Sequence, residues 1–137
     1  MRKLLLTLAV VACVVPALAL AAQPKKDSAF QWCENKNSCP LGFETNPKGT
    51  KIIDIRAYNK CAQVPATYPK IKVKDDGTFS KSGNVTDVTG NKLNYKIEGK
   101  FKKPKKAVGT YDIDAKGCKA DAQKFVAKRV GKAQPGI

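Results

Sequence analysis

The chain has 137 residues and a formal net charge of +15, from 26 lysine and arginine residues against 11 aspartate and glutamate residues. It contains no histidine, which excludes Ser-His-Asp and Cys-His catalysis in their usual forms, and histidine-based zinc sites. The length is sufficient for one domain with a single hydrophobic core.

Residues 1–22 predict a cleaved secretory signal peptide. Arg2 and Lys3 precede an apolar run that is broken by Pro16 and ends in small residues around Ala21, where a signal peptidase would cut. A membrane-spanning helix needs about 20 apolar residues, and this run is shorter and interrupted. Loss of Arg2 and Lys3 would lower the net charge from +15 to +13. We therefore expect an exported protein, periplasmic or extracellular.

The apolar run also contains Cys13, preceded by a triplet that resembles the bacterial lipobox. Only a few apolar residues come before this cysteine. Lipidation there would leave the mature protein beginning with a further hydrophobic stretch. Cleavage near Ala22 is therefore preferred to lipidation at Cys13.

Residues 23–50 predict a flexible leader followed by a loop. The first part is rich in Gln, Pro, Lys and Ser, and the part after Trp32 is dense in the turn formers Asn, Pro and Gly. A short bridge between Cys33 and Cys39 is expected to close this loop. The folded core is then expected to begin after residue 50.

Four cysteines remain after signal cleavage. An even number in an exported chain favours two disulfides over metal ligation, although four cysteines allow three pairings. We prefer Cys33–Cys39, which closes a short polar loop, with Cys61–Cys118, which joins the end of one strand to the start of another. No metal site and no cofactor are expected.

The pattern of residues 51–130 predicts a single β domain. Asp75-Asp76-Gly77 and Thr89-Gly90-Asn91 are turn sequences between alternating runs. Residues 93–101 alternate most regularly, with apolar side chains and Gly99 on one face and polar side chains on the other. Residues 103–106, which include Pro104, are expected to turn the chain into another strand, and residues 131–137 are expected to form a frayed tail.

Three Gly-x-aromatic tripeptides occupy residues 77–79, 99–101 and 109–111. In each, the glycine and the ring lie on the same face of a strand. Glycine permits a sharp bend in a sheet, and a neighbouring ring can cover the exposed backbone. The tripeptides therefore predict a curved sheet or barrel. The alternative, an aromatic platform for carbohydrate, would require outward-facing rings.

The densest basic cluster lies around residues 96–106, and its lysines are candidates for binding a polyanion. Lysine offers a hydrated point charge, whereas arginine favours shaped recognition of anions. The cluster therefore predicts diffuse attraction to an anionic envelope polymer. Its members are Lys96, Lys100, Lys102, Lys103, Lys105 and Lys106.

Two other functions are weaker hypotheses. The first is an inhibitor or partner-binding module for an acidic protein, since a basic surface would repel a basic partner. The second is a carboxylate-dependent hydrolase using Asp75 with Asp76, or Asp112 with Asp114. Asp75 and Asp76 fit a turn better than an active site, so we expect no enzyme. Sequence-specific binding of nucleic acid is not expected, because no such motif is present.

Residues 118–130 fit either a helical stripe or a strand face, and the local pattern slightly favours a helix. However, residues 52–129 resemble a group of small exported bacterial proteins of unknown function. The shared order is Cys61, Gly77-Thr78-Phe79, Ile97-Glu98-Gly99-Lys100-Phe101, Gly109-Thr110-Tyr111, Cys118 and Phe125-Val126-Ala127-Lys128-Arg129.

This resemblance implies that the segment after Cys118 is a strand, and it implies no activity. The loop between Cys33 and Cys39 departs from the pattern. The fold expected from the residues and the resemblance together is all-β. We predict an antiparallel sandwich or barrel-like meander of about seven strands, held by the bridge between Cys61 and Cys118.

Overall fold

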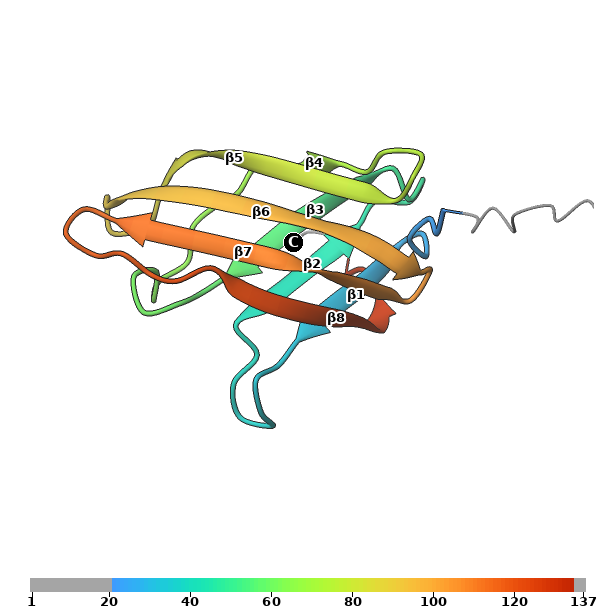
Figure 1. Cartoon of the computed structure of the whole chain (residues 1–137), viewed down its shortest axis with the longest axis horizontal. Coiled ribbons are helices and arrows are strands. Elements are labelled where there is room, and N and C mark those ends of the chain that lie inside the picture. Colours follow the sequence, from blue (N-terminus) through green and yellow to red (C-terminus); the bar gives the residue numbers. More distant parts are fainter. Residues whose placement is uncertain (1–20, 135–137) are drawn as a thin grey trace, which may run out of the picture.

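The computed structural model describes residues 21–134, which form one antiparallel sheet without a helix (Figure 1). Its eight strands are β1 (Ser28–Trp32), β2 (Leu41–Thr45), β3 (Lys51–Ala57), β4 (Ile71–Lys72), β5 (Thr78–Thr86), β6 (Lys92–Lys103), β7 (Lys106–Ala115) and β8 (Gln123–Lys132). The spatial order is β4-β3-β2-β1-β8-β7-β6-β5. Strands adjacent in sequence pair as hairpins, except β4 and β5, which are the two edges of the sheet, and β1 pairs with β8, so the sheet curls into a nearly closed barrel. The all-β prediction is confirmed, with eight strands rather than about seven.

The prediction that the fold begins after residue 50 was wrong. Strands β1 and β2 lie in the middle of the sheet, and the rings of Phe30 and Phe43 stack in the core with centroids 5.3 Å apart. Each strand has only five residues, and the surrounding turn formers concealed their alternation. The hydrophobic effect of burying these rings outweighs the local turn preference.

The prediction of a frayed tail from residue 131 also needs correction. Gly131 and Lys132 belong to β8, and they pair with Ala29 and Ser28 of β1. Residues 135–137 of the expected tail and residues 1–20 of the expected signal peptide lie outside the described residues.

The segment after Cys118 contains the strand β8, as the resemblance implied. Phe125 and Ala127 are buried, whereas Val126 and Val130 are exposed. This inside-outside alternation has the period of a strand. The local pattern favoured a helix because it counted Val126 and Val130 as part of a buried apolar stripe. Both are exposed, so that preference was misleading.

Strand β3 contains a β-bulge at Asp54, which has a φ of +47°. The register between β2 and β3 shifts at this point. The extra residue allows Ile52 and Ile55, which lie three positions apart, both to face the core. A regular strand would have placed one of them on the outer face.

Aromatic rings fill the interior of the barrel. Phe101 is completely buried, and its ring centroid lies 5.4 Å from that of Phe30 and 5.5 Å from that of Phe79. Tyr111 is 1% exposed. Because the rings of all three Gly-x-aromatic tripeptides face inward, they cannot form the alternative carbohydrate platform.

Gly99 and Gly109 let β6 and β7 approach closely, at a point where they pair directly. The ring of Phe79 covers Gly99, and the ring of Phe125 covers Gly109. A methyl group on Gly109 would collide with the carbonyl oxygen of Glu98 and would lie 2.7 Å from the Cα of Gly99. The rings thus cover the bare backbone of these glycines, in a sheet that curls into a nearly closed barrel.

Replacing Gly109 by alanine is therefore expected to lower the free energy of unfolding by about 1–3 kcal/mol, through overpacking against backbone that cannot move away. Gly131→Ala is the matched control, because no atom lies within 4 Å of its added methyl group. Urea titration of both variants measures the difference. Equal stability of the two variants would contradict the close approach at Gly109.

Both predicted disulfides are present, Cys33–Cys39 and Cys61–Cys118. They lie at the end of the barrel formed by the β1–β2, β3–β4, β5–β6 and β7–β8 connections, which we call the disulfide end. Two disulfides are typical of an oxidising, non-cytoplasmic compartment. Among residues 21–134, no helix is long and apolar enough to cross a membrane.

Candidate anion-binding surface

The opposite end of the barrel gathers lysines from several turns. We call it the lysine end; it comprises residues 22–26, the β2–β3 and β4–β5 turns, and the β6–β7 turn with the adjoining residues of these two strands. The backbone N–H of Lys25 donates to the carbonyl of Pro104 at 2.7 Å. The side-chain amide of Gln23 donates to the carbonyls of Lys74, at 3.3 Å, and Asp75. These bonds hold residues 22–26 across the barrel end, beside the β6–β7 turn.

The lysine end carries more cations than carboxylates. Its exposed lysines are Lys25, Lys26, Lys48, Lys74, Lys102, Lys103 and Lys105. The nearby carboxylates are Asp27, Asp75 and Asp76. The Asp76 carboxylate accepts bonds from the hydroxyl and backbone N–H of Thr78, at 2.6 and 3.0 Å. These hydrogen bonds hold the pKa of Asp76 below its usual value, the hydroxyl contributing most.

The structure separates the six lysines that the sequence grouped together. Five of them lie at the β6–β7 turn or in the adjoining residues of these strands, and we call them the lysine hairpin: Lys100, Lys102, Lys103, Lys105 and Lys106. Lys96 lies farther along β6, opposite Asp112 of β7. Its ammonium nitrogen is 3.1 Å from a carboxylate oxygen of Glu98. The charge of Lys96 is thus offset locally.

Sequence reasoning missed Lys25, Lys26, Lys48 and Lys74 as neighbours of the lysine hairpin. They are far from it in the sequence, and only the barrel topology brings their turns to one end. The predicted flexible leader also hid the bond between Lys25 and Pro104. No local sequence signal could have identified this grouping.

The chemistry of the lysine end is that of exposed point charges. Within residues 21–134, no member of the lysine hairpin forms an ion pair with a carboxylate. Exposed ammonium groups on flexible side chains adapt to many anion geometries and favour none. The lysine end can therefore attract a chain of negative charges.

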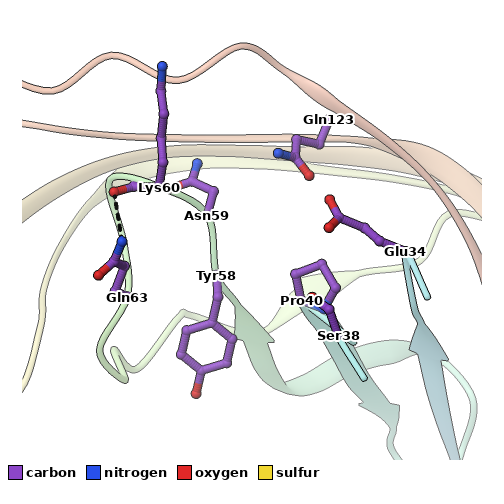
Figure 2. Close-up of a pocket in the computed structure, with 8 residues that line it drawn as sticks. All are labelled: Glu34, Ser38, Pro40, Tyr58, Asn59, Lys60, Gln63 and Gln123. Carbon is purple, nitrogen blue, oxygen red and sulfur yellow. Dashed lines mark hydrogen bonds between the residues drawn. The ribbon is translucent and has the colours of Figure 1, made fainter. Parts of the chain in front are cut away.

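A polar hollow of about 400 Å³ lies at the disulfide end (Figure 2). Its lining residues are Glu34, Ser38, Pro40, Tyr58, Asn59, Lys60, Gln63 and Gln123. In Figure 2 the Lys60 side chain extends away from Glu34, and the Tyr58 ring points away from Gln123. The charged groups therefore do not converge on a common point.

Hydrogen bonds beneath this hollow fix its walls. The Tyr111 hydroxyl donates to the Tyr58 carbonyl at 2.8 Å, and the Asn59 side chain donates to the Ile113 carbonyl at 2.9 Å. Burial, with a smaller effect of the Glu34 charge, raises the pKa of Tyr111 to about 12. The hydroxyl therefore remains protonated at neutral pH and acts as a structural donor.

The carboxylates considered for hydrolysis do not form a cluster. Asp75 and Asp76 lie in the β4–β5 turn, where Gly77 has a φ of +80° and donates its N–H to the Lys74 carbonyl. The Asp114 carboxylate accepts a bond from the Ala120 N–H at 2.8 Å, and one oxygen of Asp112 is buried without a hydrogen-bond partner in the described part of the chain. Among residues 21–134, no three Cys, Asp or Glu residues come together as metal ligands would.

The fold and surface together define a small, disulfide-linked antiparallel barrel with a packed aromatic interior and one lysine-rich end. Comparisons of the chain with protein-family models, curated proteins and solved structures found no match.

Proposed function

We propose that this is an exported, non-enzymatic protein that binds anionic polymers of the cell envelope or its surroundings through the lysine end. The observation that carries the proposal is the gathering of exposed lysines from separate turns around the lysine hairpin. The interior is filled by aromatic side chains, so the proposed ligand binds on the surface. The disulfides fit an oxidising compartment.

The proposed binding is electrostatic. A linear polyanion carries condensed counterions, and a protein that neutralises its charges releases them. Affinity should then fall linearly as salt increases, on logarithmic scales. Long lysine side chains at the rim of the lysine end can follow an irregular polymer without fixed geometry.

The test uses the triple variant Lys102→Gln, Lys103→Gln and Lys105→Gln, with a fluorescent single-stranded oligothymidine as a phosphate polymer of regular charge spacing. Titration across a salt series should show a slope of log affinity against log salt that is smaller by about 2, since each phosphate contact on a single strand contributes about 0.7. The variant should also elute from a heparin column at lower salt.

The matched control is Lys36→Gln, Lys116→Gln and Lys119→Gln, which removes the same charge from exposed lysines at the disulfide end. We expect this control to retain most of the wild-type slope. Equal losses in the two triple variants would mean that net charge alone attracts the polymer, and would overturn the assignment to the lysine end. Binding that persists at high salt would contradict the electrostatic mechanism.

A further inference from the structure

The barrel has an opening between β4 and β5, the two edges of the sheet. The strands are tied at their turn, where the Lys74 N–H donates to the Thr78 carbonyl at 2.8 Å. At the far end of β5, the Val88 N–H donates to the Pro65 carbonyl at 3.0 Å. Between these two bonds, in the described part of the chain, β5 forms a ladder with β6 and none with β4.

The backbone groups that face this opening follow from the register of β5 with β6. At one end the Phe101 N–H donates to the Gly77 carbonyl, and at the other the Asp87 N–H donates to the Asn91 carbonyl. The register between these points is unbroken, so the odd-numbered residues of β5 bond to β6. The N–H and C=O groups of Ser80, Ser82 and Asn84 therefore point into the opening. Within residues 21–134 these groups have no backbone partner, and they form the free edge of a strand.

Residues 80–84 are all exposed, including Lys81 and Gly83, which lie on the side of the strand that faces inward. Lys81 and Gly83 pair with Ile97 and Tyr95, which are only 3% and 4% exposed. A methyl group on Gly83 would lie 3.6 Å from the Tyr95 ring, which shows that this ring lies directly under the strand. The edge of β5 is therefore open to solvent along residues 80–84, whereas the side chains of Tyr95 and Ile97 beneath it are already covered.

We propose that the edge of β5 binds an extended acidic segment of a partner protein as an added antiparallel or parallel strand. The backbone of Ser80, Ser82 and Asn84 would supply the hydrogen bonds, as in other cases of strand addition. Lys81 is exposed and shares the inward register of Phe79, whereas Lys70 and Lys72 are exposed on either side of the buried Ile71 and lie on the outer face. Acidic side chains on either face of the added strand would therefore lie near a cation. This site is separate from the lysine end.

Charge also argues against a second copy of this chain as the occupant. If the β5 edges of two copies paired, the Lys81 side chains of both copies would lie on the same pair of strands. An inward-pointing lysine at an edge is one of the devices that prevent such self-association. An acidic strand converts the same lysine into an attractive contact.

The probe is an acetylated, amidated peptide of alternating Glu and Val, with a Lys and Val peptide as its charge-reversed counterpart. On isotope-labelled protein, the Glu peptide should shift the amide resonances of Ser80, Ser82 and Asn84 more strongly than those of the lysine hairpin. Lys81→Glu should weaken binding of the Glu peptide and strengthen binding of the Lys peptide. Shifts confined to the lysine hairpin would overturn the proposal.

Ser82→Pro tests the backbone contact directly. The Ser82 N–H does not bond to β6, so proline at this edge removes the outward donor and leaves the ladder in place. Affinity for the Glu peptide should fall about tenfold, and Ser82→Ala, which keeps the N–H, should bind like the wild type. Unchanged affinity in Ser82→Pro would overturn the proposal, as would a dimer of the free protein that this substitution dissociates.

A second measurement keeps the test independent of the folding of Ser82→Pro. The Glu peptide can be N-methylated on alternate amides, on one edge or on the other. Wild-type protein should bind the peptide that is methylated on one edge and should not bind the peptide that is methylated on the other edge. Equal binding of both peptides would show that no strand is added.

Discussion

Replacing Phe101 by alanine is expected to lower the free energy of unfolding by about 3–5 kcal/mol. The side chain is fully buried, and its ring packs edge-on against Phe30, with tilted contact to Phe79. The loss combines removal of apolar surface with a cavity that rings on neighbouring strands cannot fill. A domain of this size has a total stability of about 5–15 kcal/mol, so the variant would be close to unfolding.

Urea denaturation followed by tryptophan fluorescence measures this effect. Val88→Ala is a suitable control, because Val88 is 73% exposed and its truncation should change stability by less than about 0.5 kcal/mol. The slope of free energy against urea should be similar in both variants. A loss at Phe101 no larger than that at Val88 would contradict the packed interior.

The second half of the fold could be predicted from the sequence because its strands are long and amphipathic. Strand β6 has twelve residues, with Leu93, Tyr95, Ile97 and Phe101 all buried. The turns before and after the neighbouring strand β5 contain Gly77 and Gly90. Both glycines adopt positive φ, as their turn sequences indicated. Alternation over this length leaves little freedom in register.

The first half could not be predicted in this way, because its strands are short and depend on long-range pairing. Strand β1 is stable because it lies between β2 and β8, which come from opposite ends of the described chain. Its alternation around Phe30 spans too few residues to stand out from the polar leader. The bulge at Asp54 further disturbed the period of β3.

The candidate sites divide in the same way, since their local features could be predicted from the sequence and their long-range features could not. The lysine hairpin is a local feature, and the sequence identified it, although it also included Lys96, whose charge is offset by Glu98. The contribution of Lys25 and the open edge of β5 depend on which elements lie side by side. Those arrangements arise from the closure of the barrel, to which residues from both halves of the chain contribute.

The two proposed sites make different demands on the fold. The lysine end needs only that several turns remain near one another, so moderate loosening of the barrel should reduce polymer binding slightly. The β5 edge needs a fixed width of the opening, whose ends are held by the bonds from Lys74 to Thr78 and from Val88 to Pro65. Loss of the connections at the disulfide end should therefore impair peptide binding before polymer binding.

Removing the Cys61–Cys118 bridge with the double variant Cys61→Ala and Cys118→Ala is expected to lower the free energy of unfolding by about 4 kcal/mol. The cysteines are 57 positions apart, and a bridge across so long a loop restricts the unfolded chain strongly. Cys33→Ala with Cys39→Ala is the matched control. That pair is separated by six positions, so the same chain-entropy model predicts a loss of about 2 kcal/mol.

Thermal and urea unfolding of both double variants measure the comparison. The bridge between Cys61 and Cys118 also joins the β3–β4 and β7–β8 connections across the barrel end, where the Asn59 side chain bonds to the Ile113 carbonyl. Its removal should therefore speed amide exchange in residues 58–68, which border the opening beside β5. If the short-loop variant proved the less stable of the two, restriction of the unfolded chain could not be the main contribution of these bridges.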